Sequence, residues 1–420
     1  MRILTSSTVR GSSASAKPAD LFDKCREFRR PQELRDAGLY MYFEAFGDRS
    51  GCGPGEIRLG ERRVLMFGSN DYLALNTHPK VVEAAQRALA RYGTGCSGSR
   101  LLNGTLELHV EVEAKLAALV HKEAAIIFGT GFQANYAGIS ALAEKGEALI
   151  CDHNLHASCV EGELRSPART IRFRHNDMDH LERCLKDCAQ EPAMIVSEGV
   201  FSMEGDLADI PGIVDLARRY HARVYIDEAH GIGVLGATAA GTAEHFGALD
   251  QVDVIMGTFS KSLAAVGGFL ASEEAVINYL KHLARPFVFS ASLPPASVAA
   301  VGASLDIMRE EPERQSHVLR IAAFLRKELR LAGFDVLDGI TPIVPVVIPN
   351  EVDLCRLCKS LLADGGIYVN PVLRPAASQN LLRISCTAAH SEAHVTRLVE
   401  TLADLRRQLG IVTAASAAAD

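Results

Sequence analysis

The strongest constraint on the fold is a regular alternation of short apolar segments with amphipathic segments between about residues 61 and 290. Each apolar segment has the length of a strand, and stretches of helical periodicity such as Pro211–Tyr220 separate them. This alternation predicts an α/β fold with a mostly parallel sheet covered by helices on both faces. The predicted strands are Ala124–Phe128, Ala148–Cys151, Ala193–Ser197, Ala222–Ile226 and Val252–Met256.

Beyond about residue 300 the pattern changes to longer helices with fewer strands, which predicts a smaller α+β unit. We expect one charged helix over residues 20–45, and disorder over residues 1 to about 20 and 414–420. The predicted division is an N-terminal tail and helical arm (1–60), a large domain (61–298) and a small C-terminal domain (299–420).

Composition excludes several classes of protein. The net charge of −7 over 420 residues gives no reason to expect nucleic acid binding. Two uncharged stretches, Ala124–Ala143 and Pro286–Leu305, are interrupted by glycine or proline, so we expect no transmembrane segment. The ten cysteines include closely spaced pairs, but neither a further cysteine pair nor histidines lie near them at the spacing of zinc ligands. We therefore expect reduced thiols in a cytoplasmic protein and no metal site.

Two of the predicted strands end at residues that suit pyridoxal 5'-phosphate (PLP). Lys261 follows one strand within Gly257–Ser262, and Asp227 follows another. PLP needs an amine that holds it as a Schiff base and an anion against its pyridine nitrogen. A lone lysine is more often a solvated loop residue, but the two strand-end positions and the motifs below favour the PLP site.

The segment Phe128–Asn135 follows a strand and opens a predicted helix. Its glycines let backbone N–H groups approach an anion, and the helix dipole favours a negative charge there. This suits the PLP phosphate, for which Thr258 and Ser260 supply further hydroxyl donors. A plain strand–helix turn is the alternative.

Three other side chains are candidates for contacts with cofactor or substrate. His156 follows a strand and is placed to stack on a cofactor ring, although a structural histidine is the alternative. His230 lies three residues after Asp227, within reach of the cofactor's phenolic oxygen. Arg383 interrupts an apolar strand and needs an anionic partner, either a substrate carboxylate or a structural salt bridge.

Two motifs match patterns of other functions, but each lacks a neighbouring sequence element that its function requires. Gly93–Gly98 matches the dinucleotide-binding pattern G-x-G-x-x-G, but a predicted helix, Lys80–Tyr92, precedes it where a strand is required. Asp227–His230 spells the DEAH box of helicases, but no Gly-Lys dipeptide for a phosphate-binding P-loop occurs in the chain. We therefore expect neither NAD nor nucleoside triphosphate binding.

Taken together, these residues resemble the α-oxoamine synthase family of fold-type-I PLP enzymes over about residues 40–410. The resemblance implies a large, mostly parallel sheet of the seven-stranded type and a smaller C-terminal α+β domain. It also implies condensation of an amino acid with an acyl thioester, with loss of carbon dioxide, to give an α-amino ketone. Its marks are Asn70–Leu73, Gly98–Thr105, Glu198–Asp206, Asp227–His230 and Gly257–Ser262.

The resemblance also assigns roles around the cofactor. Lys261 corresponds to the Schiff-base lysine, Asp227 to the partner of the pyridinium and His156 to the stacking residue. His230 corresponds to the histidine beside the phenolic oxygen, with Ser202 in the same neighbourhood. The residues expected to bind or frame the phosphate are Gly131, Phe132, Thr258 and Ser260.

For substrate and assembly, the resemblance implies a homodimer with active sites at the subunit interface. Ser290 corresponds to a phosphate contact from the second subunit, and Asn70 and Arg383 to substrate contacts, with Arg383 gripping the carboxylate. Arg374, in Arg374–Ser378, is similar to a second arginine that approaches the carboxylate, although the loop departs from the family pattern at its third and fifth positions.

Within the family, Arg285–Pro295 and Asp364–Asn370 are similar to the bacterial serine palmitoyltransferase branch. Gly231 and Asn70–Leu73 are instead more similar to the 8-amino-7-oxononanoate synthase branch, which uses alanine. A synthase of a secondary pathway with alanine, glycine or another amino acid is the alternative. The acyl group arrives on coenzyme A or on an acyl carrier protein. An aminotransferase or lyase on the same fold would differ in its product.

Overall fold

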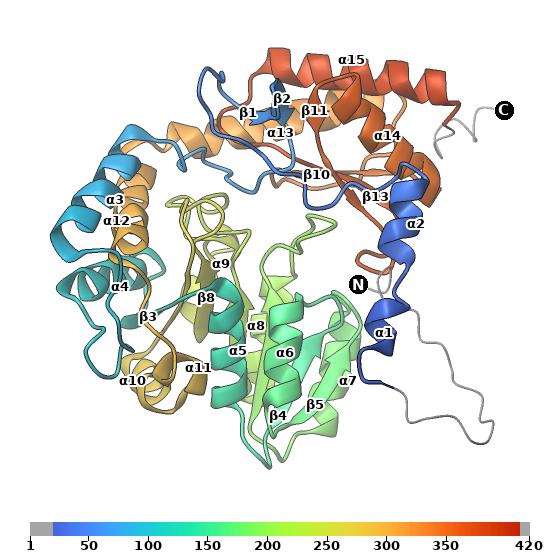
Figure 1. The fold of residues 1–420 in the computed structure, drawn as a ribbon. Coiled ribbons are helices and arrows are strands. Elements are labelled where there is room, and N and C mark those ends of the chain that lie inside the picture. The colour runs from blue at the N-terminus through green and yellow to red at the C-terminus, as the bar shows by residue number, and fades with distance from the viewer. Residues whose placement is uncertain (1–19, 412–420) are drawn as a thin grey trace.

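The computed structural model describes residues 20–411, and a seven-stranded sheet forms its centre (Figure 1). The strand order is β3-β9-β8-β7-β6-β4-β5, in which β9 runs antiparallel to both neighbours and the other pairings are parallel. The predicted α/β fold with a mostly parallel sheet is confirmed. The strands are β3 (Ala124–Phe128), β4 (Ala148–Asp152), β5 (Arg169–Phe173), β6 (Ala193–Glu198), β7 (Arg223–Asp227), β8 (Val254–Thr258) and β9 (Gly268–Ser272).

Two of these strands, β5 and β9, were not predicted from the sequence. Strand β5 lies at the edge of the sheet, and Arg169, Thr170 and Arg172 are exposed on it, so it contains no continuous apolar run. Strand β9 is wholly buried but consists largely of small residues, including Gly268 and Ser272. Hydrophobic patterning therefore found the strands that are rich in large aliphatic side chains and missed the others.

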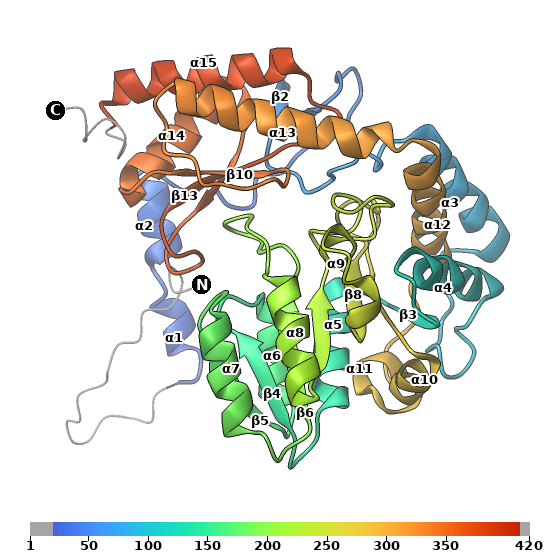
Figure 2. The ribbon, with the colours of Figure 1, turned by 180° about the vertical axis from the view of Figure 1, so that it is seen from behind.

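Helices cover both faces of the sheet, as predicted. Helices α5 and α6 lie on the face seen in Figure 1, and α7 and α8 lie on the face seen in Figure 2. Most of the sheet's large apolar side chains are buried between these layers. The helices around this sheet are α3 (Pro79–Tyr92), α4 (Glu107–Leu119), α5 (Gly131–Leu142), α6 (Ala157–Arg165), α7 (Met178–Asp187), α8 (Ile210–Tyr220), α9 (Thr242–His245), α10 (Glu274–Leu283), α11 (Arg285–Val288) and α12 (Pro295–Glu310).

A second hydrophobic core lies in the C-terminal part of the chain, under the helices at the top of Figure 1. Two three-stranded sheets contribute to it, in the orders β10-β13-β12 and β1-β2-β11. The division at residues 298 and 299 stays a prediction, and helix α12 runs through it. The elements are α13 (Glu313–Leu331), α14 (Glu351–Ala363), α15 (Glu392–Leu409), β1 (Glu56–Leu59), β2 (Arg62–Met66), β10 (Ile343–Val347), β11 (Ile367–Tyr368), β12 (Asn370–Val372) and β13 (Leu381–Ser385).

The N-terminal arm differs from the single charged helix that we expected. It contains two short helices, α1 (Asp23–Arg26) and α2 (Arg30–Asp36), with Pro31 in the first turn of the second. Proline starts a helix well but cannot continue one, because it has no N–H and restricts the residue before it. The predicted disordered tails lie outside the described residues. Within residues 20–411, no helix is long and apolar enough to cross a membrane.

A buried ion pair fixes the Gly98–Thr105 segment to the central sheet. Arg100 donates from Nη1 and Nη2 to the two carboxylate oxygens of Glu113 in α4, at 2.8 and 3.0 Å. Both side chains are 7% exposed, and Glu113 also accepts from the backbone N–H of Ile127 in β3. Removing one partner of such a pair leaves the other charge buried without compensation.

We expect Glu113→Ala to lower the free energy of unfolding by about 3 kcal/mol or more, because Arg100 and the Ile127 N–H both lose their acceptor. Urea unfolding followed by circular dichroism measures the change. Lys115→Ala in the same helix is the control, because its pair with Asp306 is 44% and 37% exposed. That variant should lose less than about 1 kcal/mol. Equal losses in the two variants would contradict the assignment.

Candidate active site

A pocket of about 280 Å³ lies where β6, β7 and β8 end, at the carboxyl edge of the central sheet. Glu198, Asp227 and Thr258 are the last residues of these three strands, and all three line it. Ligands of open α/β sheets collect at this edge. Eight predicted site residues line the pocket: Gly131, Phe132, His156, Asp227, His230, Thr258, Ser260 and Lys261.

Asp227 is a buried carboxylate whose oxygens are held by neighbouring donors. Asn135 Nδ2 donates to Oδ2 at 2.6 Å, and the backbone N–H of Ala229 donates to Oδ1 at 2.8 Å. Asn135 is fixed in turn by Tyr225, whose hydroxyl donates to its amide oxygen at 2.8 Å. A buried charge is stable only when such donors replace its water. This network therefore holds an anion in a defined direction inside the pocket.

His156 is the N-cap residue of α6, and its ring is oriented by Ser158. Its Nδ1 accepts from the Ser158 backbone N–H at 3.2 Å and lies 2.7 Å from the Ser158 hydroxyl. Burial lowers the pKa of His156, and the nearby Lys261 amine lowers it further, while Asp227 opposes the shift. The ring is therefore neutral and presents an aromatic surface to the pocket.

Lys261 is the one lysine among the residues that line this pocket. Burial lowers the pKa of Lys261 to about 8, while the carboxylates of Asp227 and Glu198 counteract part of this shift. Among residues 20–411, its Nζ has no hydrogen-bond partner. A lysine in this state can act as a nucleophile near neutral pH, because a substantial fraction is uncharged.

The part of the pocket beside the first turn of α5 is suited to a phosphate. Helix α5 begins there, so the backbone N–H groups of Gly131 and Phe132 point out of its first turn. A side chain at Gly131 would place its Cβ 2.6 Å from Thr258 Oγ1, so only glycine allows this close approach. The Thr258 and Ser260 hydroxyls lie 3.0 Å apart beside it. Together with Asp227 and Lys261, these groups fit the phosphate, ring nitrogen and aldehyde of PLP.

A second network connects the pocket to β13. Tyr72 places its hydroxyl 2.7 Å from His230 Nδ1 and 3.3 Å from Asn70 Oδ1. Asn70 Oδ1 accepts from Arg383 Nη1 at 3.2 Å, and Ser385 Oγ accepts from the same nitrogen at 2.8 Å. Arg383 is 6% exposed and has no acidic partner within residues 20–411. The structural salt bridge considered for Arg383 is therefore absent from the described part of the chain.

Five predicted site residues do not line the pocket. Asn70 and Arg383 belong to the network described above, and the other three lie elsewhere. Ser202 contributes its backbone carbonyl to Arg383 Nε at 2.7 Å. Ser290 accepts from Gln133 Nε2 at 2.7 Å, outside the pocket lining. Arg374 is exposed on the loop between β12 and β13. The roles predicted for these three side chains stay predictions.

Sequence reasoning missed three residues of the site. Glu198 ends β6 as Asp227 ends β7, so the strand-end rule that found Asp227 would also have found it. Asn135 lies four residues after Gly131 on α5, and helical periodicity places the two on one face. Tyr72 shows no such signal, because its contact with His230 joins residues 158 positions apart.

Glu198 has an unusual environment for an acid. It is 3% exposed, and its Oε1 accepts from the backbone N–H of His156 at 2.5 Å. Burial raises the pKa of Glu198 well above its usual value, and the charge of Asp227 raises it further. Two neighbouring acids in one pocket do not both ionise readily, so we expect Glu198 to carry a proton when Asp227 is charged.

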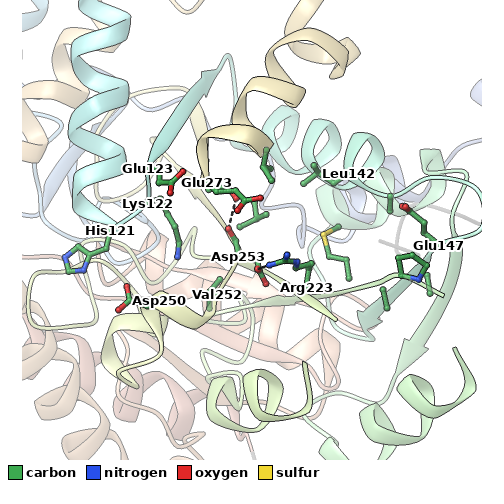
Figure 3. A pocket seen from close by; sticks show the side chains of 18 residues that line it. His121, Lys122, Glu123, Leu142, Glu147, Arg223, Asp250, Val252, Asp253 and Glu273 are labelled. Carbon is green, nitrogen blue, oxygen red and sulfur yellow. Dashed lines mark hydrogen bonds and ion pairs between the residues drawn. The ribbon is translucent and has the colours of Figure 1, made fainter. Parts of the chain in front are cut away.

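A larger hollow of about 460 Å³ lies at the opposite edge of the sheet, where the parallel strands begin (Figure 3). Its basic groups already have partners within the protein. Arg223 Nη1 donates to Asp253 at 2.6 Å, and Lys122 Nζ donates to the Leu249 carbonyl at 2.9 Å. Position and chemistry therefore identify the smaller pocket as the candidate active site.

The chain is similar to known proteins in both sequence and structure. Residues 62–402 match the family described as aminotransferase class I and II. The chain is 44% identical to a serine palmitoyltransferase from Sphingobacterium spiritivorum, over 93% of this chain and 98% of that protein. It is 42% identical to a putative 8-amino-7-oxononanoate synthase 2 from Mycobacterium tuberculosis, over 93% of this chain and 50% of that protein. A serine palmitoyltransferase structure from S. paucimobilis with bound PLP and myriocin has a TM-score of 0.89 and 34% identity, covering 94% of this chain and all of that one.

The pKa of Lys261 can be tested on cofactor-free protein. We expect the rate of PLP uptake to rise through about pH 8, because only the uncharged amine attacks the aldehyde. Rapid mixing followed by visible absorption gives the rate at each pH. Asp227→Asn should move the midpoint below that of the natural chain, because the Asp227 carboxylate raises the pKa of Lys261. A midpoint near the ordinary lysine value of about 10.4 in both proteins would disprove the assignment.

Proposed function

This chain belongs to the aminotransferase class I and II family, and from that premise we propose that it is a PLP-dependent acyltransferase of the α-oxoamine synthase type. The reaction joins the α-carbon of an amino acid to the acyl carbon of a thioester. The amino acid loses its carboxyl group as carbon dioxide, and the thioester loses its thiol. The product is an α-amino ketone.

The observation that carries this proposal is the convergence of Lys261 and Asp227 on one pocket, in a chain similar to serine palmitoyltransferases over nearly its whole length. We propose serine as the amino acid and a long-chain acyl group as its partner. The acyl carrier is coenzyme A or an acyl carrier protein. The second candidate is an alanine-using reaction of the 8-amino-7-oxononanoate synthase type, which the similarity to those synthases favours.

The residues that line the pocket have separate roles in this reaction. Bound PLP supplies an electron sink for the negative charge that develops on the substrate α-carbon. Lys261 holds the cofactor and then accepts the α-proton at Nζ, for which a pKa of about 8 is well placed. Asp227 would hold the pyridine nitrogen in its protonated form, because a neighbouring carboxylate favours that form. His156 would hold the cofactor ring, as the resemblance implies.

His230 and Arg383 orient the other groups. Burial holds the pKa of His230 well below its usual value, so the ring is neutral. When the Tyr72 hydroxyl donates to Nδ1, Nε2 carries the proton and is free to donate to the cofactor's phenolic oxygen. Arg383 binds the substrate carboxylate, while its Nε and Nη1 donate to protein acceptors that hold the guanidinium in place.

We further propose a homodimer that shares its active sites. Three apolar side chains in or near the active-site region are strongly exposed in the single chain: Leu102 (79%), Phe289 (77%) and Val266 (59%). A second copy that covers them would also place Ser290 at the partner's phosphate site, as the resemblance implies. We place the enzyme in the cytoplasm, because its ten cysteines are all free thiols.

The proposal predicts equal release of carbon dioxide and free thiol when the enzyme receives L-serine and palmitoyl-coenzyme A. Trapped carbon dioxide and a thiol-reactive dye measure the two products, and mass spectrometry identifies the ketone. Lys261→Ala should lower kcat by at least about a thousandfold, because the α-proton loses its acceptor. Lys122→Ala, which changes a lysine in the other pocket, is the control. Release of a keto acid in place of carbon dioxide would instead indicate an aminotransferase.

Gly231, which resembles the alanine-using branch, has a packing explanation in this structure. A Cβ at this position would lie 1.9 Å from Glu228 Oε2. That carboxylate is fully buried and accepts from the backbone N–H groups of Thr242 and Ala243, each at 2.8 Å. Because Glu228 fills the space, glycine at 231 follows from packing and does not by itself indicate which amino acid is used.

We therefore expect Gly231→Ser to lower the free energy of unfolding by about 1–3 kcal/mol, since Glu228 must give up its contacts with α9. The ratio of kcat/KM for serine to that for alanine should stay within about threefold of the starting value. Urea unfolding and steady-state kinetics give the two readings. Gly95→Ser is the control, because a Cβ there meets no atom within 4 Å. A tenfold change in the ratio would show that Gly231 does select the amino acid.

A further inference from the structure

His175 joins two carboxylates that come from different parts of the fold. Its Nδ1 lies 3.0 Å from Asp152 Oδ1, and its Nε2 lies 2.9 Å from Asp206 Oδ2. Asp152 ends β4 and is buried, whereas Asp206 lies in a hairpin of residues 200–207, closed by a bridge between its first and last residues. The ring also packs edge-on against Phe201 of this hairpin, at 4.3 Å between centroids.

The two contacts together require a charged imidazole. Each carboxylate only accepts hydrogen bonds, and a neutral histidine has a single N–H to offer. Burial disfavours charge on His175, but its hydrogen bonds to Asp152 and Asp206 outweigh this effect and raise the pKa of His175 to about 10. At neutral pH the bridge therefore consists of two charge-assisted hydrogen bonds, which are shorter and stronger than neutral ones.

The neighbouring residue strengthens the same connection. Asn176 donates from its backbone N–H to Asp152 Oδ2 at 3.2 Å, and from Nδ2 to the Leu207 carbonyl at 2.9 Å. His175 and Asn176 thus both fasten hairpin 200–207 to the end of β4. Neither residue lines the active-site pocket, so any effect on the reaction is indirect.

Hairpin 200–207 in turn holds Arg383. The Ser202 carbonyl is the acceptor for Arg383 Nε, at 2.7 Å, and no other acceptor for Nε occurs among residues 20–411. Nη1 is occupied by Asn70 and Ser385. A guanidinium is planar, so fixing Nε and Nη1 also fixes the direction in which Nη2 points. A shift of the hairpin would rotate or release this plane.

We propose that His175 is a positioning residue for the amino-acid substrate. By fastening hairpin 200–207 to the end of β4, it aims Arg383 at the substrate carboxylate. The inference rests on the proposed function, because it takes Arg383 as the residue that binds this carboxylate. His175 should therefore affect amino-acid affinity more than PLP binding or the chemical steps.

The test uses PLP-loaded enzyme without acyl thioester. L-serine and L-alanine are titrated separately, and the change in the visible absorption of bound PLP gives each dissociation constant. His175→Gln keeps one amide donor but removes the charge, so we expect the dissociation constant of the accepted amino acid to rise about tenfold. PLP affinity, measured by dialysis, should stay within about twofold, as should kcat at saturating amino acid.

Two further variants separate positioning from general stability. Arg172 lies on β5, three residues before His175, and Arg172→Gln removes its ion pair with Glu163 of α6 without changing the hairpin. It should leave the dissociation constant unchanged. Asp206→Asn removes the charge that His175 contacts on the hairpin. If His175 acts through Asp206, adding His175→Gln to Asp206→Asn should raise the dissociation constant by less than about twofold.

The outcomes are distinct. Amino-acid affinity equal to that of the natural chain in His175→Gln, even with a lower melting temperature, would overturn the proposal and leave His175 a structural residue. A full tenfold effect of His175→Gln in the Asp206→Asn background would also overturn it, because the route would bypass the hairpin. If the unaltered enzyme shows no spectral response to any amino acid, the proposed function itself fails.

Discussion

The active site depends on a buried negative charge at the end of β7. Asp227 is 4% exposed, and folding must replace the water that its carboxylate loses. Asn135 and the Ala229 N–H supply part of that replacement, and Asn135 is itself held by Tyr225 and Ser158. Because Ser158 also orients His156, the residue expected along the cofactor ring is tied to the residue expected at its nitrogen.

The same charge sets the proton affinities around it. It favours the charged form of Lys261 and thereby limits the fall in pKa that burial causes. It also raises the pKa of Glu198, an acid that burial already disfavours as an anion. The pocket therefore holds an acid, Glu198, whose pKa is raised, and a lysine, Lys261, whose pKa is lowered. Such perturbed titratable groups are typical of catalytic sites.

The sequence predicted the parts of the site that follow from strand periodicity. Lys261, Asp227 and His156 each follow an apolar strand, and parallel strands bring their carboxyl ends to one edge. It did not predict β5, whose exposed arginines hide the strand pattern, or the contact of Tyr72 with His230. Ser290 and Arg374 lie outside the pocket of the single chain, so the fold alone leaves their predicted roles open.

The position of Arg383 shows why the contacts around the site matter beyond the pocket itself. Asp227 ends strand β7 of the seven-stranded sheet and Lys261 follows strand β8 of the same sheet, whereas Arg383 belongs to the separate sheet β10-β13-β12. A carboxylate bound by Arg383 and an α-carbon presented to Lys261 belong to one small molecule, so the two sheets must keep a fixed relation. Direct links near the site help to provide it, through Tyr72 and Asn70 on one side and hairpin 200–207 on the other. Charge in the His175 bridge makes the second link stronger than neutral hydrogen bonds would make it.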